Sequence, residues 1–368
     1  MAYVSSIQRP TLVLNETRAR RNIRHMADKA AASGVRFRPH FKTHQSAGVG
    51  EWFRDASVGA ITVSSVDMAA YFARHGWLDI TVAFPVNVRQ AAVVNELAGQ
   101  IQLNLLVESA EAVETLAPKQ RHEAAAWIKI DTGYGRTGIQ WDDNGRLSEV
   151  ARAVEQTQTL GLTGLLAHAG HTYGARSVNR IVEIYRETAS RMVRARDALA
   201  AEGWHVLLSV GDTPSCSIMP RFESVNEVRP GNFVFYDLAQ LALGACSEAD
   251  IALAVACPVV AKHGSRSQLV IYGGAVHLSK ESIPGDDGHE IYGRIALPAE
   301  QGWSSMYRDR AVVSLSQEHG IVQAEEELFS RTRVGDLLVI LPVHSCLTAN
   351  LLGKFVTVEG RAIEMAKY

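Results

Sequence analysis

Eight short apolar runs alternate with helix-forming stretches between about residue 12 and residue 240. The runs lie near residues 36–43, 59–63, 79–84, 102–107, 125–131, 161–168, 206–211 and 224–229. Helix-forming stretches lie near residues 65–74, 87–98, 109–121, 144–156 and 176–202. Regular alternation is typical of an α/β fold with a parallel sheet, and eight repeats match a (β/α)8 TIM barrel. A doubly wound open sheet is the alternative; the number of repeats and the length of the chain favour the barrel.

The pattern changes after about residue 245. The segments that follow are rich in Val and Ile and are separated by turn signals; they are 251–262, 268–276, 310–316, 336–343 and 355–365. A chain of 368 residues is also long for a single core. We therefore predict a barrel over residues 12–245 and a C-terminal β domain over residues 246–368, completed by residues 1–11.

Charge and composition narrow the class of partner. The formal net charge is −2 and there is no long basic run, which argues against a nucleic acid or an anionic membrane surface. No window approaches the roughly 20 consecutive apolar residues of a membrane-spanning helix. Four cysteines without paired spacing fit a reducing compartment, and residues 1–10 do not resemble a signal peptide. We expect a cytoplasmic protein that binds a small molecule.

Residues 38–44 read Arg-Pro-His-Phe-Lys-Thr-His. If they form a strand, four basic side chains share one face: Arg38, His40, Lys42 and His44. Such a face is not an ordinary apolar core, because one buried unpaired charge would cost several kcal/mol. Lys42 is near the carboxyl end of the predicted strand, where barrel enzymes hold their chemistry, and positive surroundings favour an amine that forms imines. A solvated sheet edge is the alternative.

Residues 342–348 in the predicted β domain read Pro-Val-His-Ser-Cys-Leu-Thr. In an extended segment His344 and Cys346 point the same way, so an imidazole and a thiolate can share one metal ion. Their softness favours zinc, and two protein ligands leave open positions for a substrate hydroxyl. The alternative is an ordinary buried histidine beside a free cysteine.

Three further segments follow predicted barrel strands. Residues 131–138 form a Gly-rich loop in which Arg136 can face an anionic oxygen. Residues 209–215 offer backbone N–H groups and hydroxyls suited to a phosphate, at Gly211, Thr213 and Ser215. Residues 167–173 hold two histidines and a tyrosine among small residues, which suggests a pocket floor. Ordinary turns and a structural histidine are the alternatives.

Residues 38–44 resemble the cofactor-lysine motif of the D-serine dehydratase and D-threonine aldolase family, which shares the alanine racemase type of pyridoxal-phosphate (PLP) barrel. Further matches follow in order along almost the whole chain. The resemblance implies that Lys42 is the Schiff-base lysine, that Arg136 contacts the phenolic oxygen, and that His168 packs on the pyridine ring. The implied cofactor site comprises Lys42, His40, Arg136, His168, Tyr173, Gly211, Thr213, Ser215, Arg229, Gly231 and Tyr236.

Arg229 precedes Pro230 and Gly231, as a similar arginine does in alanine racemases, where it faces the pyridine nitrogen. Such an arginine would keep that nitrogen unprotonated and weaken the electron sink. Members of the dehydratase and aldolase branch vary at this position, so the role of Arg229 stays open. Gly231 and Tyr236 would complete the phosphate cup, and Tyr173 would line the substrate side.

The pair His344 and Cys346 resembles the metal pair of D-serine dehydratases, whereas the best-studied D-threonine aldolases have aspartate where Cys346 stands. The resemblance implies a PLP- and metal-dependent lyase acting on D-3-hydroxy amino acids, with Lys42, His344 and Cys346 as catalytic residues. Dehydration of D-serine or D-3-hydroxyaspartate to a 2-oxo acid and ammonia is favoured. Retro-aldol cleavage to glycine and an aldehyde is the alternative. Zinc is favoured, with manganese and magnesium left open.

Two other classes share the barrel. A racemase needs a second base opposite Lys42, for which Tyr272 and Tyr292 are candidates. A non-catalytic PLP carrier is typically a barrel alone. The β domain and the His-x-Cys pair count against both classes. The family also implies a homodimer.

Overall fold

The computed structural model describes residues 3–367 and divides them into two compact units. The barrel unit consists of residues 24–42 and 53–231. The strand-rich unit consists of the remaining described residues, 3–23, 43–52 and 232–367. Among residues 3–367, no helix has the length and apolar character needed to cross a membrane.

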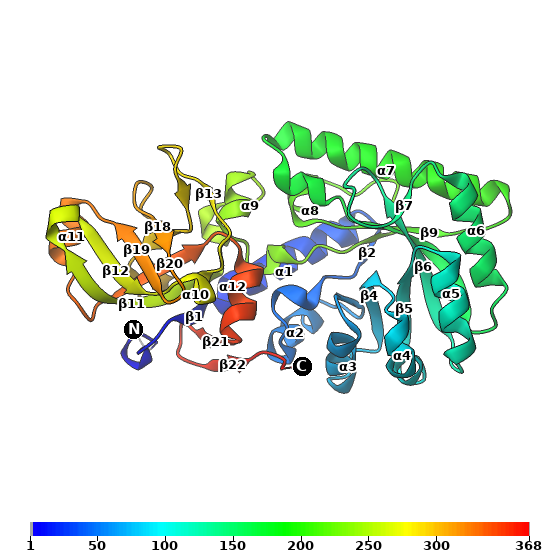
Figure 1. Cartoon of the computed structure of the whole chain (residues 1–368), viewed down its shortest axis with the longest axis horizontal. Helices are drawn as coiled ribbons and strands as arrows, with labels where there is room; N and C mark the ends of the chain where they lie inside the picture. The colour runs from blue at the N-terminus through cyan, green and yellow to red at the C-terminus, as the bar shows by residue number, and fades with distance from the viewer. Residues whose placement is uncertain (1–2, 368) are drawn as a thin grey trace. The chain divides into compact units, whose positions relative to one another are not determined.

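A parallel sheet forms the centre of the barrel unit (Figure 1). Its strand order is β2 (Arg36–Phe37), β10 (Glu227–Val228), β9 (Leu207–Val210), β8 (Leu160–Ala167), β6 (Ala124–Asp131), β5 (Gln102–Val107), β4 (Asp79–Pro85) and β3 (Ile61–Val63). A parallel bridge between His40 and Thr62 joins the two ends of this order, so the eight strands close into a barrel. Each of the eight predicted runs overlaps one of these strands, although β2 covers only the first two residues of its run, and the predicted barrel is confirmed.

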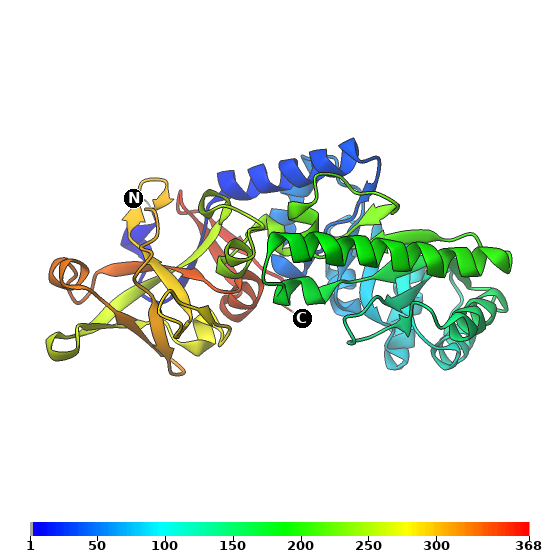
Figure 2. The ribbon, with the colours of Figure 1, turned by 90° about the horizontal axis from the view of Figure 1, so that it is seen from above.

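Helices surround the sheet of the barrel unit (Figures 1 and 2). They are α3 (Val66–Arg74), α4 (Ala91–Ala98), α5 (Ala110–Leu116), α6 (Asn144–Glu155), α7 (Val178–Ala201) and α8 (Thr213–Ile218), while α1 (Glu16–Ala32) contributes residues to both units. Side chains cap most of their first turns, as when Ser65 accepts from the Met68 N–H and Ser177 from the Arg180 N–H. The short strand β7 (Ile139–Gln140) pairs with β6 beyond the predicted set.

A second sheet forms most of the strand-rich unit. Its order is β18 (Val312–Leu315), β19 (His319–Gln323), β12 (Gln268–Tyr272), β11 (Leu253–His263), β1 (Thr11–Leu14), β21 (Lys354–Thr357) and β22 (Ala362–Glu364). Strand β20 (Leu337–Pro342) pairs with β11 and with β15 (Gly293–Ala296). Because β1 lies between β11 and β21, the N-terminal strand completes this sheet.

Helices and short hairpins complete the strand-rich unit. The helices are α2 (Ala47–Arg54), which continues as far as the barrel unit, α9 (Leu238–Ala242), α10 (Ala275–Leu278), α11 (Glu326–Arg331) and α12 (Ser345–Leu352). The hairpins are β13 (Ile283–Pro284) with β14 (Glu290–Ile291), and β16 (Pro298–Ala299) with β17 (Gly302–Trp303). Helix α2 has no counterpart among the predicted helices.

The interior of the barrel holds a buried ion network around Arg38. The Arg38 guanidinium donates to Glu227 Oε2 at 2.5 Å and to the carboxylate of Asp79, and Arg38 is only 1% exposed. Asn104 Nδ2 also donates to Asp79 Oδ1, at 3.0 Å. The prediction that Arg38 shares a face with Lys42 is therefore wrong. The strand ends at Phe37, and Arg38 turns inward because two carboxylates compensate its charge.

Replacing Arg38 with methionine is expected to lower the free energy of unfolding by about 3–5 kcal/mol, because Glu227 would be left buried without its cation and Asp79 would keep only the half-exposed Arg36. Urea titration followed by circular dichroism measures the loss. The matched control is the triple variant Arg38→Met, Asp79→Asn, Glu227→Gln, which also neutralises the two carboxylates. It should recover part of the lost free energy of unfolding. A loss below about 1 kcal/mol for Arg38→Met would contradict the assigned role of the network.

Candidate active site

Lys42 lies in a single turn of 3-10 helix, Phe41–Thr43, rather than on a strand. Its neighbour Phe41 is fully buried and packs against the rings of Phe53 and Trp77, with centroids 4.8 and 5.0 Å away. Lys42 itself is exposed, and its backbone N–H donates to His40 Nδ1 at 3.4 Å. The buried ring thus anchors a turn that presents the lysine to solvent. His44 is fully buried in the strand-rich unit, so it does not share a face with Lys42.

His168 follows β8 and is held by the barrel wall. Its Nδ1 is 2.7 Å from the carbonyl oxygen of Gly211, so Nδ1 carries the hydrogen of the neutral ring. Burial lowers the pKa of His168 to about 3, despite this bond. The nearby positive charges of Lys42, Arg136 and Arg229 contribute to this low pKa. These cations therefore converge on His168, and its imidazole is neutral near pH 7.

The depressed pKa of His168 predicts a loss of stability in mild acid. Between pH 6.5 and pH 3 the unfolded chain binds a proton at this residue and the folded chain does not. The free energy of unfolding of the cofactor-free protein should therefore fall between pH 7.5 and pH 5.5. In His168→Asn this fall should be smaller by about 1.4 kcal/mol. Urea titrations at the two pH values measure it, with His205→Asn at an exposed position as control. Equal losses in wild type and His168→Asn would contradict the buried neutral ring.

Arg136 lies in the Gly-rich loop that follows β6. Asp131 shapes this loop, because its Oδ1 accepts hydrogen bonds from the N–H groups of Gly133, Tyr134 and Gly135 at 2.9–3.1 Å. These bonds lower the pKa of Asp131 although its burial acts to raise it. Arg136 is exposed, with its guanidinium 5.1 Å from the centre of the Tyr134 ring. The loop thus presents a cation on the same side of the barrel as His168.

The loop after β9 has the properties of a phosphate site. Gly211 lies so close to the next strand that a Cβ would stand 2.7 Å from the Arg229 backbone, so no side chain fits there. The hydroxyls of Thr213 and Ser215 are buried and have no hydrogen-bond partner among residues 3–367. The Thr213 N–H donates to the phenolic oxygen of Tyr173 at 3.4 Å. Unsatisfied buried hydroxyls beside a glycine are what an absent anion would leave, so these residues fit a phosphate group.

Arg229 is buried inside the barrel and hydrogen-bonded there. Its Nε donates to Ser209 Oγ at 2.7 Å, and its Nη2 donates to the carbonyl oxygen of Ala167 at 2.5 Å. Burial lowers the pKa of Arg229 to about 10. Ser209 in turn donates to Glu227, so Arg229 joins the network that holds Arg38.

Gly231 ends the barrel unit, and Tyr236 belongs to the strand-rich unit. Tyr236 is buried and has a positive φ of 49°, which is uncommon for a tyrosine. Its backbone N–H donates to the Asn232 carbonyl at 2.8 Å. The proposed share of Gly231 and Tyr236 in the phosphate cup stays a prediction.

Lys129, which is absent from the residues predicted above, lies on β6 and is buried. Its Nζ donates to the carbonyl oxygen of Ile130 at 2.9 Å. Burial, together with the nearby charges of Arg229 and Arg136, lowers the pKa of Lys129 to about 8. The sequence signal for Lys129 was its place in the apolar run Ala-Trp-Ile-Lys-Ile. Lysine is rarely buried without a charged partner, so a lysine in such a run indicates a special environment.

His344 and Cys346 are not on an extended segment, which corrects the sequence-based geometry. His344 has an extended backbone and precedes α12, whereas Cys346 lies in the first turn of that helix. The two side chains nevertheless interact. Burial acts to lower the pKa of His344, but its hydrogen bond to Cys346 and the negative charge of that sulfur raise the pKa to about 9.

Besides His344, the side chains of Thr43 and Asn232 contact the sulfur of Cys346. Thr43 Oγ1 is 3.3 Å from Cys346 Sγ, and Asn232 Nδ2 is 3.5 Å from it. Within residues 3–367 no cluster of three or more His, Cys, Asp or Glu side chains could hold a metal ion. An imidazole, a thiol and a buried Asn232 Oδ1 without a partner among those residues fit a metal with two protein ligands and open positions.

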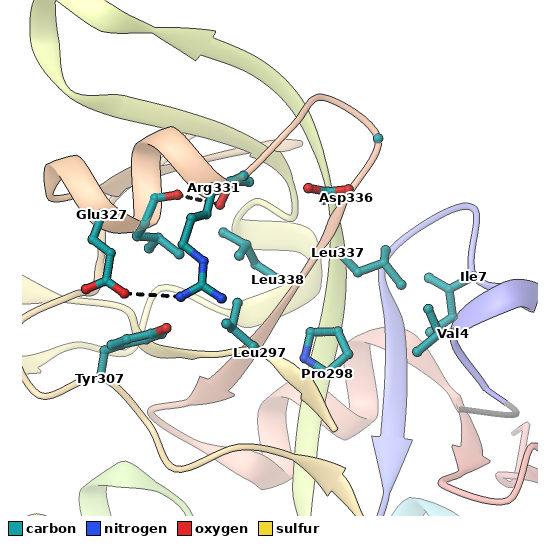
Figure 3. Close-up of a pocket in the computed structure, with 13 residues that line it drawn as sticks. Val4, Ile7, Leu297, Pro298, Tyr307, Glu327, Arg331, Asp336, Leu337 and Leu338 are labelled. Atoms are coloured by element: carbon teal, nitrogen blue, oxygen red, sulfur yellow. Dashed lines mark hydrogen bonds and ion pairs between the residues drawn. The ribbon is translucent and has the colours of Figure 1, made fainter. Parts of the chain in front are cut away.

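Figure 3 shows a cavity of about 450 Å³ in the strand-rich unit. Its walls are largely apolar, with Val4 and Ile7 on one side and Leu338 on another, and a Glu327–Arg331 ion pair of 3.2 Å at its edge. None of the site residues predicted from the sequence lines it. This cavity is therefore not part of the candidate active site.

Comparison with known proteins identifies the family. The model of the alanine racemase N-terminal domain matches residues 14–238, and that of a putative serine dehydratase domain matches residues 252–358. The first match alone covers more than half of the chain. The chain belongs to the D-serine dehydratase and D-threonine aldolase family of fold type III PLP enzymes. Members named as relatives are PLP-dependent dehydratases and aldolases, so the chain is a lyase of this family.

One relative is a D-threo-3-hydroxyaspartate dehydratase from Delftia sp. strain HT23, 30% identical over 93% of this chain and 92% of its own length. Its solved structure superimposes with a TM-score of 0.91 at 28% identity, covering 100% of both chains. A cysteine-to-alanine mutant of that dehydratase, solved in the metal-free form, has a TM-score of 0.92 at 28% identity and covers 99% of this chain and 98% of its own. A 3-hydroxy-D-aspartate aldolase from Paracoccus denitrificans is 27% identical over 98% of this chain and 91% of its own.

Proposed function

We propose that this family member is a PLP- and metal-dependent dehydratase of D-3-hydroxy amino acids. The observation that carries the proposal is the paired imidazole and sulfur of His344 and Cys346, which interact although a serine separates them. A relative with a dehydratase name, and the metal-free form of its cysteine mutant, support it. D-Serine and D-threo-3-hydroxyaspartate are the proposed substrates.

Lys42, Arg136 and His168 would hold the PLP ring. Gly211, Thr213 and Ser215 would hold its phosphate through one backbone N–H and two buried hydroxyls. When bound, PLP supplies the electron sink for a negative charge at Cα, and a metal on His344 and Cys346 supplies a Lewis acid for the substrate 3-hydroxyl.

Lys42 would carry the cofactor linkage at rest and afterwards take the Cα proton with its free amine. Its exposed position in the barrel unit leaves the side chain accessible for that role. Neutral His168 offers no proton near pH 7 and so would act as a packing surface.

The reaction balances without an oxidant. The Cα–H and Cβ–O bonds break and one water leaves; water then replaces the amine, so D-serine becomes pyruvate and ammonia. The aldolase alternative breaks the Cα–Cβ bond and releases glycine and an aldehyde. The relative with an aldolase name keeps this alternative open. Cysteine at position 346 favours dehydration, because aspartate stands there in the best-studied D-threonine aldolases.

Product analysis tests the proposal. The PLP- and zinc-loaded enzyme is incubated separately with D-serine, D-threonine and D-threo-3-hydroxyaspartate, and 2-oxo acid, ammonia, glycine and aldehyde are measured. Equal amounts of 2-oxo acid and ammonia are expected. Glycine and aldehyde would make the enzyme an aldolase instead.

We also infer a homodimer from the family, whose members commonly complete the mouth of one barrel with a second subunit. Size-exclusion chromatography with light scattering should give about twice the 40.1 kDa of one chain. A mass of one chain at micromolar concentration would contradict this inference.

A further inference from the structure

The sulfur of Cys346 has two polar neighbours in the strand-rich unit that the dehydratase proposal does not use. Thr43 Oγ1 lies 3.3 Å from Cys346 Sγ and Asn232 Nδ2 lies 3.5 Å from it. Both neighbours are buried, Thr43 fully and Asn232 to within 6% exposure. They come from distant parts of the sequence, so the fold itself brings them to the sulfur.

The orientation of the Asn232 amide follows from its other contacts. Its Nδ2 is 2.6 Å from Asp237 Oδ2, and a carboxylate accepts hydrogen bonds but does not donate them. The Ser345 N–H and hydroxyl also donate to Asp237 Oδ2, at 2.9 and 3.2 Å. The amide nitrogen must therefore face Asp237. Its second hydrogen is shared between Ser345 Oγ, at 3.2 Å, and Cys346 Sγ, so the group directed at Cys346 is an N–H donor.

The direction of the Thr43 contact follows from the chemistry of metal binding. Cysteine binds metals as a thiolate, which has no proton to donate. Once Cys346 is a thiolate, the Thr43 hydroxyl is the donor in that pair. The thiolate would then accept one O–H and one N–H hydrogen bond. Thr43 also follows Lys42 directly in the chain.

We propose that Thr43 and Asn232 are positioning residues that hydrogen-bond the Cys346 thiolate and thereby set how strongly it donates to the metal. The proposal rests on the proposed function, because it assumes a metal on His344 and Cys346. Each hydrogen bond draws electron density from the sulfur, which leaves the metal a stronger Lewis acid towards the substrate 3-hydroxyl. Asp237 holds the Asn232 amide in the orientation that makes this bond.

The remaining atom of the Asn232 amide supports this assignment. Its Oδ1 is buried and has no hydrogen-bond partner among residues 3–367. Buried acceptors in native proteins are normally satisfied, so an unsatisfied one beside the metal pair needs a partner that the protein chain does not provide. A hydroxyl or water held at the metal is such a partner.

Cobalt(II) provides the test, because its absorption reports directly on a sulfur ligand. The holoenzyme is loaded with PLP and cobalt, and its sulfur-to-cobalt charge-transfer band is recorded for wild type and for Cys346→Ala as the blank. Thr43→Val and Asn232→Ala each remove one donor to the sulfur. Thr43→Ser keeps the hydroxyl, and Ser345→Ala loosens the Asp237 network without removing a donor to Cys346.

Removing a donor raises the energy of the sulfur lone pairs, so Thr43→Val and Asn232→Ala should each move the band to longer wavelength. Both should also lower kcat by about 10-fold, the usual scale for groups that support metal ligands, with KM nearly unchanged. The two control variants should keep the wild-type band. Circular dichroism confirms that each variant is folded.

Three outcomes overturn the inference, and they are distinguishable. A wild-type spectrum identical to that of Cys346→Ala would refute the metal site and with it the proposed function. A wild-type band that stays in place in folded Thr43→Val and Asn232→Ala would refute only the positioning role. An equal shift in Ser345→Ala would show that the band reports loosening of the network rather than loss of a donor.

Discussion

Alanine in place of Lys42 is expected to lower kcat/KM for D-serine by roughly three orders of magnitude, because the enzyme would lose both its covalent hold on PLP and the base for the Cα proton. The residues proposed to hold the phosphate and the ring remain, so non-covalent PLP binding should survive. Steady-state ammonia release measures the first effect. Borohydride reduction followed by peptide mapping shows which lysine holds PLP covalently. Wild type should carry reduced PLP on Lys42, and Lys42→Ala should carry none at that position.

Added methylamine provides the control for Lys42→Ala. A small amine can replace the missing side chain as base, so the variant should regain part of its activity as amine is added. Lys42→Arg has a positive charge but no amine that forms imines at neutral pH, and it should stay inactive. PLP fixed to a different lysine in wild type, or a Lys42→Ala variant with nearly full activity, would remove Lys42 from the mechanism.

Alanine at His344 or at Cys346 is expected to abolish metal binding and, with it, dehydration. Either substitution removes one of the two protein ligands of the metal ion. The zinc content of each variant should therefore be far below the roughly one ion per chain expected for wild type. Both variants should keep PLP, because the proposed PLP ligands lie almost entirely in the barrel unit. Elemental analysis of dialysed protein, together with 2-oxo acid release, measures the two effects.

Cys257→Ala is the control, since Cys257 is a buried cysteine of the strand-rich unit with no role in the proposed site. It should keep its zinc and its turnover, at some cost in stability from the small cavity that the change leaves. Stoichiometric zinc in Cys346→Ala, or equal zinc loss in Cys257→Ala, would place the metal elsewhere.

The overall fold was accessible to sequence analysis because short apolar runs alternate with helix-forming stretches along the barrel unit. The runs that became β5, β6 and β8 have their predicted positions to within a residue or two. Residues 38–44 were harder to place. Pro39 has no N–H to donate to a neighbouring strand, so the predicted strand stops at Phe37. The chain then turns, and the buried Phe41 ring packs against Trp77.

The candidate site was predictable where a short motif carries its chemistry, as at Lys42 and at His344 with Cys346. It was not predictable where chemistry depends on contacts between distant segments. Arg38 pairs with Glu227, 189 residues away, and Thr43 meets Cys346 across 303 residues. No local pattern reports such pairs, because only the closed fold brings their side chains together.

Chelation of the wild-type holoenzyme tests the central claim most directly. Zinc content, 2-oxo acid and ammonia are measured on one sample before treatment with EDTA, after it, and after zinc is restored, with PLP retained throughout. The account predicts about one zinc per chain, equal 2-oxo acid and ammonia from D-serine or D-threo-3-hydroxyaspartate, loss of both products on chelation, and their return with zinc. Undiminished turnover by the zinc-free, PLP-loaded enzyme would contradict it.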